Sequence, residues 1–200
     1  LCWSARAFLI SISKREFDHM QLRQSSSSVQ NIWAGVLASS SVLGSLALAC
    51  IFPFAAIATL LAATLPFRKA AVWMGAVWFA NQLVGYLILG YPQTANSFGH
   101  GLAMGATAMA TLFVAKTVLD MRSDRSFVTL GLAFVAAFAA YEALLLLAAT
   151  FLGGVQNFMP SIVWMVAQND ILWFAGLAIL YMVLDGTLFE RIGKHANPLG

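Results

Sequence analysis

Residues Cys50 to Met104 read CIFPFAAIATLLAATLPFRKAAVWMGAVWFANQLVGYLILGYPQTANSFGHGLAM, and the fold is predicted outward from this stretch. It has no acidic residue, and its only Lys or Arg residues are the adjacent Arg68 and Lys69. Two apolar runs flank this pair, which is typical of an anchor at one face of a bilayer. The uncharged polar residues lie elsewhere, and at membrane depth such residues usually mark an interior or a site.

The composition of the whole chain indicates the same class. Of its 200 residues, 60% are hydrophobic and 10% are charged, and the mean hydropathy is +0.81. A soluble domain carries far more charge. Helix-length apolar runs without the alternation of an outer-membrane barrel leave a helical bundle as the structure that satisfies the backbone in lipid. We therefore predict an all-α, polytopic membrane protein, and we attribute the net charge of +3 to orientation in the bilayer, with no nucleic-acid partner.

The uncharged segment from Ile32 to Phe67 is too long for one straight span. Its 36 residues would form a helix of about 54 Å, whereas the hydrocarbon core is about 30 Å thick. Pro53 is the predicted break, because its ring removes a backbone donor and clashes with the preceding turn. We expect two segments, Ile32 to Ile51 and Phe54 to Phe67. The alternative is one kinked span beginning near Gly44, with the residues before it lying along the membrane surface.

Later apolar runs predict four further spans, which are Ala70 to Gly90, Gly99 to Leu119, Phe127 to Leu152 and Ser161 to Leu184. The expected organisation is a disordered or interfacial tail over residues 1–31, a transmembrane bundle over 32–190 and a short cytoplasmic tail over 191–200. Because residue 1 is Leu, the natural start is open between Leu1 and Met20.

About six spans place both termini on one side of the membrane. If that side is cytoplasmic, the basic residues sort to the inside, as the positive-inside rule requires. These residues are Lys14, Arg15, Arg23, Arg68, Lys69, Lys116, Arg122, Arg125, Arg191 and Lys194. The predicted outer loops contain no Lys or Arg, so we expect both termini to be cytoplasmic.

A few polar side chains fall at membrane depth. They are Asn81, Gln82, Glu142, Asn169 and Asp170. On the predicted topology, Asn81, Glu142 and Asp170 lie about 14–15 Å below the outer ends of their helices, from a rise of about 1.5 Å per residue. These three residues therefore lie at the same depth in the membrane. Either they hydrogen-bond one another and lock the bundle, or they form a polar floor beneath a cavity that opens outward.

Three segments are expected to approach one mouth at the outer face: Cys50, the loop from Tyr91 to His100, and the loop from Gln156 to Met159. His100 and Met104 are four residues apart and share a helix face. A thiolate or an imidazole there is a suitable ligand for a transition metal. Alternatively, Cys50 is a small buried residue that only fills space in the core. His100 could likewise be only a polar residue at the start of a helix.

Small residues spaced four apart, such as Ala55 with Thr59 and Gly101 with Gly105, predict close helix packing. Trp33 and Trp164, near predicted helix ends, are typical of interfacial belts. The sequence contains no P-loop, no Gly-x-Ser-x-Gly and no His-Glu-x-x-His motif. We therefore expect neither an ATPase of the P-loop type nor a hydrolase of those types, and we classify the chain as a non-enzyme.

Three motifs carry a resemblance to a known family: Cys50-x-x-Pro53-Phe54-Ala55-Ala56, the run WFANQLVGY from Trp78 to Tyr86, and Gly90-Tyr91-Pro92. With these motifs the chain resembles the solitary cobalamin-uptake family called BtuM, which is related to the substrate-binding S components of energy-coupling factor transporters. The resemblance covers about the middle third of the chain. It implies a six-helix bundle in the bacterial inner membrane that captures cobalamin at the outer face, with a cysteine bound to the corrinoid cobalt.

Carried onto this sequence, the resemblance makes Cys50 the cobalt ligand. Cobalamin is then a bound substrate rather than a catalytic cofactor, and the partners are the lipid bilayer and either an energy-coupling ATPase with its transmembrane module or none. Aromatic rim residues would hold the corrin ring, and amides would hydrogen-bond its amide side chains. The expected substrate-binding residues are Cys50, Phe52, Phe54, Asn81, Tyr91, Gln93, Asn96, His100, Gln156, Asn157 and Phe158.

Two other functions are compatible with the residues. In a proton-linked or ion-conducting carrier, Glu142 and Asp170 would relay protons across the bundle. Such a carrier would fail when either acid is neutralised and would tolerate loss of Cys50. A haem or copper protein using His100, Met104 and Cys50 ranks lowest, because the chain lacks the second histidine within the membrane that a bis-histidine haem requires.

Overall fold

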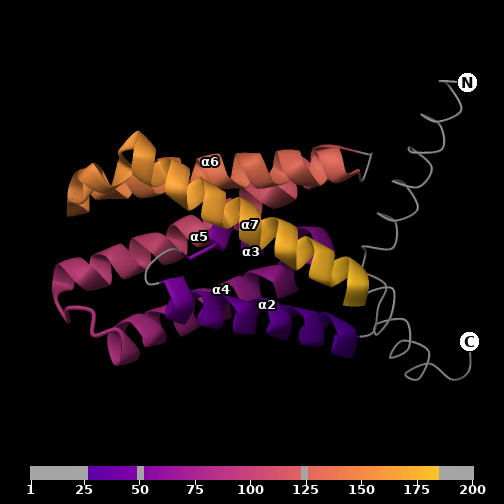
Figure 1. Ribbon diagram of the computed structural model, residues 1–200, viewed down its shortest axis with the longest axis horizontal. Helices are drawn as coiled ribbons and strands as arrows, with labels where there is room; N and C mark the ends of the chain where they lie inside the picture. Colours follow the sequence, from indigo (N-terminus) through magenta and orange to yellow (C-terminus); the bar gives the residue numbers. More distant parts are fainter. Residues whose placement is uncertain (1–26, 49–51, 123–125, 185–200) are drawn as a thin grey trace, which may run out of the picture.

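The computed structural model describes residues 27–48, 52–122 and 126–184. Within these ranges every element is a helix and none is a strand. The elements are α2 (Ser27–Leu48), α3 (Phe54–Thr64), α4 (Phe67–Leu83), the π-helix η2 (Val84–Ile88), α5 (Ala95–Met121), α6 (Phe127–Leu152), the 3-10 helix η3 (Val155–Phe158) and α7 (Pro160–Leu184), as Figure 1 shows. The predicted all-α class is confirmed for these residues.

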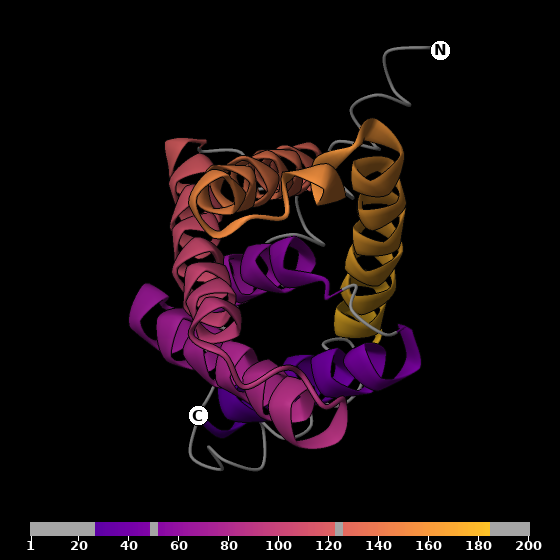
Figure 2. The ribbon, with the colours of Figure 1, turned by 90° about the vertical axis from the view of Figure 1, so that its left-hand side faces the viewer.

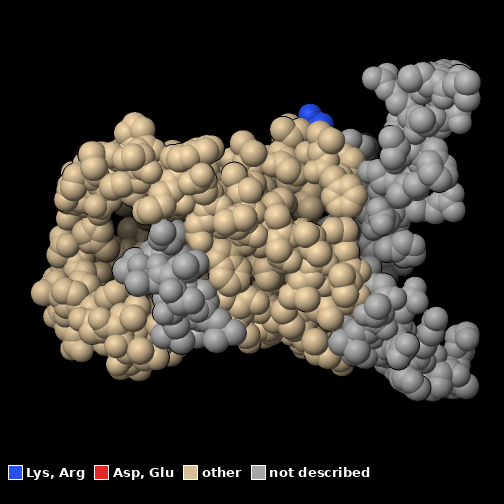
Figure 3. All heavy atoms as spheres, viewed as in Figure 1, with Lys and Arg blue, Asp and Glu red and all other residues tan. Residues whose placement is uncertain are grey.

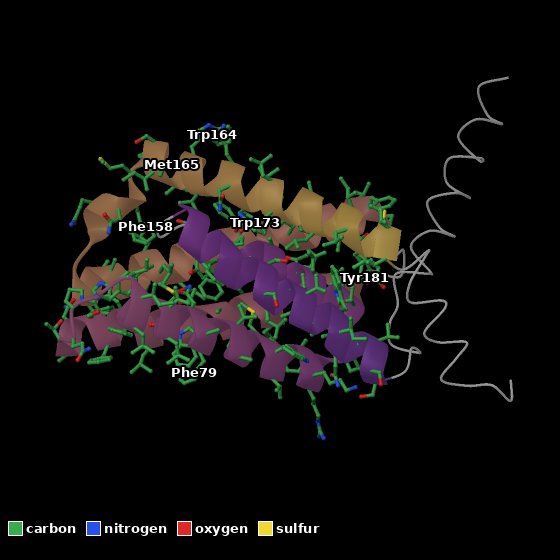
Figure 4. The ribbon with its side chains drawn as sticks, turned by 60° about the horizontal axis from the view of Figure 1, so that its bottom comes forward. Phe79, Phe158, Trp164, Met165, Trp173 and Tyr181 are labelled. Atoms are coloured by element: carbon green, nitrogen blue, oxygen red, sulfur yellow. The ribbon has the colours of Figure 1, made fainter. Side chains whose placement is uncertain are left out.

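Four helical segments are long and apolar enough to cross a membrane. They are Phe67–Ile88, Ala95–Met121, Phe127–Leu152 and Pro160–Leu184. Their outer faces carry large exposed hydrophobic side chains, including Phe79 on α4 and Trp164 on α7, which point away from the bundle in Figure 4. Exposed apolar surface of this extent is typical of contact with lipid rather than with water. These features are those of an integral membrane protein.

Helix α3 lies at the centre of the bundle. It packs against α2, α4, α5, α6 and α7, which surround it in the view along the bundle in Figure 2. All of its residues except Ala63 are buried. Its sequence, FAAIATLLAAT, is rich in Ala and Thr, whose small side chains let neighbouring backbones approach closely. The Thr59 hydroxyl donates to Ala55 O at 2.8 Å, so it is satisfied within the helix. The packing role predicted for this spacing is confirmed.

The break at Pro53 is confirmed, because α2 and α3 are separate helices that run in opposite directions (Figure 1). The alternative of one kinked span is therefore wrong. The boundaries differ from the predicted ones. Helix α2 begins at Ser27, inside the predicted tail, and α3 ends at Thr64 rather than at Phe67. Pro66 ends the short turn after α3, and its lack of a backbone N–H is no loss at the start of α4.

The described Lys and Arg residues gather at one end of the bundle, which we call the basic end. Arg68 and Lys69 lie in the first turn of α4, and Lys116 and Arg122 lie near the end of α5. Lys116 pairs with Asp120 one turn later, at the same end. The first residue of α2 and the last of α7 also lie at this end (Figure 1). The opposite end, formed by residues 89–95 and 153–159, is called the loop end.

Side-chain contacts tie α2 to its neighbours near the basic end. Lys69 Nζ donates to Ser27 Oγ at 3.0 Å and to Gln30 Oε1 at 2.7 Å. Trp33 Nε1 donates to Thr64 Oγ1 at 3.1 Å. Trp33 is 0% exposed and its ring meets the Tyr181 ring edge-on at 4.9 Å, so its predicted place in an interfacial belt is wrong. A buried indole whose N–H has a partner belongs to the core.

Helices α4 and α5 pack closely through two glycines. A Cβ on Gly101 would lie 2.4 Å from Gln82 Oε1, and one on Gly105 would lie 2.6 Å from Trp78 Cε2. Trp78 Nε1 also donates to Gly101 O at 2.8 Å. The predicted role of this glycine pair in packing is therefore confirmed, with two large side chains of α4 lying against the bare backbone of α5.

Two hydroxyl caps set the starts of the long helices. Thr94 accepts from Ser97 N at 3.2 Å, so α5 begins at Ala95 and includes Asn96, which the sequence places in a loop. Ser126 accepts from Thr129 N at 3.2 Å, and α6 spans Phe127–Leu152 as predicted. Helix α4 continues as the π-helix η2 before the loop end is reached.

Candidate functional site

Helix α3 is only half a membrane in length, and it begins inside the bundle. Its 11 residues measure about 17 Å at about 1.5 Å per residue, against a hydrocarbon core of about 30 Å. It runs from the middle of the bundle to the basic end (Figure 1). Its N-cap residue, Pro53, provides no side-chain cap. The free backbone N–H groups of its first turn therefore need an acceptor from another part of the chain.

The carboxylate of Asp170 on α7 is the acceptor side chain that lies near these groups. The backbone N–H groups of Ala55 and Ala56 face its carboxylate. These are the second and third residues of the helix, the positions that an N-cap side chain normally satisfies. A carboxylate is also stabilised by the positive end of the helix dipole. Asp170 is 2% exposed, so this contact lies within the protein interior.

Aromatic side chains and a second carboxylate complete the surroundings of this helix end. The Phe54 ring lies 5.7 Å from the ring of Tyr141 on α6 and the Phe52 ring lies 4.2 Å from Phe54. Tyr141 is buried, and Glu142 beside it is partly exposed. Both are close enough to Asp170 for their charges to interact with it. Residues of α3, α6 and α7 thus form one cluster, which we call the midplane cluster: Phe54, Ala55, Ala56, Tyr141, Glu142, Asn169 and Asp170.

The midplane cluster is placed at the depth predicted from the sequence. Asp170 comes ten residues after Pro160, the start of α7, and Glu142 comes ten residues before Leu152, the end of α6. Each acid is therefore about 15 Å from the loop end of its helix. The prediction that these two acids share a level agrees with their mutual charge interaction.

Two polar atoms of the midplane cluster are buried without a hydrogen-bond partner among the described residues. They are Asp170 Oδ1 and Asn169 Nδ2. Buried polar atoms in native proteins are nearly always paired, and an orphaned one in a low-dielectric interior is costly. Asp170 Oδ1 therefore marks a place where a proton or a ligand group is expected.

At the loop end, the start of α5 contacts the end of α6 and Gly153, the residue that follows it. Asn96 Nδ2 donates to Leu152 O at 2.9 Å, and His100 Nε2 lies 3.2 Å from Gly153 O. His100 Nδ1 lies 2.9 Å from Asn96 O, and which ring nitrogen donates depends on the tautomer. The Asn96 amide therefore satisfies Leu152 O at the end of α6, and the His100 ring donates either to Gly153 O or to Asn96 O in its own helix. Asn96 and His100 thereby join the start of α5 to the end of α6. This is a structural role, in addition to the predicted role in substrate binding.

The other predicted rim residues lie around the same end. Gln93, Gln156 and Asn157 are exposed, and the half-buried ring of Phe158 points inward in Figure 4. The Tyr91 ring meets Tyr86 edge-on at 6.0 Å. Figure 3 shows a hollow at this end of the molecule. It lies between the surface formed by η2 and α5 and the surface formed by α6, η3 and α7.

Some of the remaining predicted site residues take part in helix packing, and one lies outside the described residues. Gln82 Nε2 lies 3.8 Å from Met104 Sδ. This contact joins α4 to α5 and uses the Met104 sulfur. Asn81 is 8% exposed and lies within the bundle. Cys50 falls outside the described residues. Among the residues that are described, no three His, Cys, Asp or Glu side chains gather as a metal-binding group.

Sequence reasoning missed the partners of α3. Tyr141 and the N–H groups of Ala55 and Ala56 were not predicted as site residues. The available signal was Pro53, which starts a short apolar helix without a capping side chain, together with a lone Asp at matching depth in another helix.

Comparison with known proteins adds no family to this description: no protein-family model matches the sequence, and no match was found among curated proteins or solved structures.

Proposed function

We propose that this chain is a membrane transport protein. The observation that carries the proposal is the half-length helix α3, which begins in the middle of the bundle with a buried carboxylate at its N-terminus. Broken helices whose ends lie near the membrane midplane form the substrate and coupling-ion sites of many transporters. Acidic side chains at this depth are costly and are usually retained for a transport pathway.

The proposed orientation places the basic end in the cytoplasm and the loop end outside, with both termini inside and six membrane segments, of which α3 is half-length. It can be tested with single cysteines in a chain whose two native cysteines are replaced by Ser. Gln156→Cys in η3 should react with an impermeant maleimide on intact cells, and Arg122→Cys at the end of α5 should react only after permeabilisation. The reverse pattern would overturn the orientation.

The particular solute that we propose is cobalamin, taken up across the bacterial inner membrane. The loop end, residues 89–95 and 153–159, and the first turns of α5 up to His100 include no Asp, Glu, Lys or Arg. A site there would recognise its solute by hydrogen bonds and aromatic contact rather than by ion pairs. Exposed amides at Gln93, Gln156 and Asn157 and the ring of Phe158 match the amide side chains and flat ring of a corrinoid.

In this proposal Cys50 supplies a thiolate to the cobalt, as the family resemblance implies, and a soft sulfur ligand suits a late transition metal. The solute is bound and moved without chemical change, so the chain is a carrier or substrate-binding component rather than an enzyme. It works alone or with an energy-coupling ATPase module.

The experiment that tests the substrate is binding of radiolabelled cobalamin to the purified full-length chain, together with the absorption spectrum of the complex. The wild type and Cys2→Ala should bind cobalamin and shift its spectrum, and Cys50→Ala should lose the shift. Cys2 is the matched control because it is the only other cysteine in the chain. Absence of binding in the wild type would reject cobalamin, and an identical spectrum in Cys50→Ala would reject the thiolate ligand.

A further inference from the structure

We propose that Asp170 and Glu142 form a proton-binding pair whose protonation is coupled to solute movement past the end of α3. The inference rests on the proposed transport function and adds its energy source. Its basis is geometric: a buried carboxylate with one unpartnered oxygen, a second carboxylate within charge-interaction distance, and the end of a half-length helix held by the first.

The two acids cannot both stay ionised. Asp170 is enclosed by protein, and two negative charges close together in a low-dielectric interior repel strongly. Asp170 packs against α3, which has no titratable side chain, and α6 contributes Tyr141 and Glu142. Helix α2 and η3, the other elements near α7, also contain none among their residues. Helix α5, which packs against α6, carries His100 near the loop end and Lys116 and Asp120 near the basic end. The other elements place no basic side chain beside the pair, so we expect a proton to balance the charge.

A proton fits this site better than a metal cation. Sodium sites in broken-helix transporters use free backbone carbonyls from unwound segments or helix C-termini. The end of α3 that meets Asp170 is an N-terminus, which presents N–H groups and the positive end of the helix dipole. Both α6 and α7 continue as α-helices through this level, so their carbonyls are used within the helices. Besides the two carboxylates, the midplane cluster offers a positive charge only the Tyr141 hydroxyl and the Asn169 amide oxygen, and no free backbone carbonyl of the kind that sodium sites use.

The positions of the two acids assign them different roles. In this proposal Glu142, which is partly exposed, exchanges its proton with the solute pathway, whereas Asp170 is enclosed. A proton that moves from Glu142 to Asp170 Oδ1 breaks one O–H bond and forms another, and the negative charge moves the opposite way. Protonated Asp170 is a weaker acceptor for the N–H groups of Ala55 and Ala56, because charged acceptors bind about twice as strongly as neutral ones. Proton arrival therefore loosens the hold of α7 on α3.

Two features of α7 allow such a movement. Only 17% of its most apolar window is buried in the chain, compared with 28% for each of the other three spanning segments. Its close backbone contacts are with α3 and η3, while aromatic side chains bridge to the neighbouring helices: Phe174 stacks on Phe134 at 4.4 Å, and Tyr181 meets Trp33. A change at the junction of Asp170 with α3 acts on the main attachment of α7.

Infrared difference spectroscopy between two pH values tests the proton site without any solute. In the purified full-length chain, a carbonyl stretch of a protonated carboxylic acid in apolar surroundings should appear. Asp170→Asn should remove it, and Glu142→Gln should shift or weaken it. Asp120→Asn is the matched control, because Asp120 is an exposed carboxylate at the basic end and its loss should leave the band unchanged. A band identical in the wild type and in Asp170→Asn would overturn the proposal.

Coupling is tested in proteoliposomes with cyanocobalamin and an imposed pH gradient. The wild type and Asp120→Asn should accumulate the solute, and Asp170→Asn and Glu142→Gln should still bind it but reach only an equal concentration inside and outside. Accumulation that ignores the gradient, or that persists in both variants, would reject coupling. Failure of the wild type to bind cyanocobalamin would instead reject the proposed solute, and the infrared result would still decide the proton site.

Discussion

Replacing Asp170 should destabilise the bundle through α3, and the size of the effect can be worked out from the contacts. In Asp170→Ala the backbone N–H groups of Ala55 and Ala56 lose their acceptor in a site that is enclosed by protein. A buried donor without a partner costs about 1–3 kcal/mol, so two of them should lower the free energy of unfolding by about 2–6 kcal/mol. Asp170→Asn keeps an acceptor oxygen and loses only the charge at the helix end, worth up to about 2 kcal/mol.

The assay is unfolding of the full-length chain by sodium dodecyl sulfate in mixed bicelles, followed by tryptophan fluorescence. The expected order of stability is wild type, then Asp170→Asn, then Asp170→Ala, with a gap of about 2 kcal/mol between the two variants. Equal losses in both variants would show that charge rather than capping holds the helix. Wild-type stability in Asp170→Ala would refute the capping of α3 altogether.

Two further predictions concern packing near α3 and use the same unfolding assay. Gly105→Ala should lower the free energy of unfolding by about 1–3 kcal/mol, because the new Cβ would lie 2.6 Å from Trp78 Cε2. Gly131→Ala, the control, has nothing within 4 Å of its new Cβ and should be neutral or stabilising by up to about 1 kcal/mol; equal effects at both sites would contradict the predicted clash. Trp33→Phe should lose the bond to Thr64, about 0.5–1.5 kcal/mol, in addition to the packing lost with the smaller ring, and only the hydrogen-bond part should vanish in a Thr64→Val background.

Local signals along the sequence predicted most of the helices. Pro53 separates α2 from α3 because a proline removes a backbone donor, and that effect does not depend on the rest of the fold. The bounds of α6 follow from an uninterrupted apolar run between a Ser cap and a glycine at positive φ, Gly153. The start of α5 differs from the predicted one because the Thr94 cap lies five residues before Gly99, in a stretch whose composition predicts a loop.

Contacts between distant helices could not be predicted in the same way. The depth of Asp170 and Glu142 follows from counting residues, but their meeting at the end of α3 depends on how α6 and α7 pack. Trp33 lies near the start of α2, where a tryptophan is typical of the interface, and only the position of Thr64 and Tyr181 shows that it is buried. Cys50, the predicted cobalt ligand, lies outside the described residues, and its role stays a prediction.

The complete enclosure of α3 has a consequence for biogenesis. A segment of 11 residues is too short to be released into lipid by itself, and it has almost no outward face. We therefore expect α3 to stay paired with α4, across the turn at Pro66, during synthesis. It reaches its final position only when α5, α6 and α7 have inserted and packed around it. Chains truncated before α7 would leave the first turn of α3 uncapped in hydrocarbon, and we expect quality-control proteases to remove them.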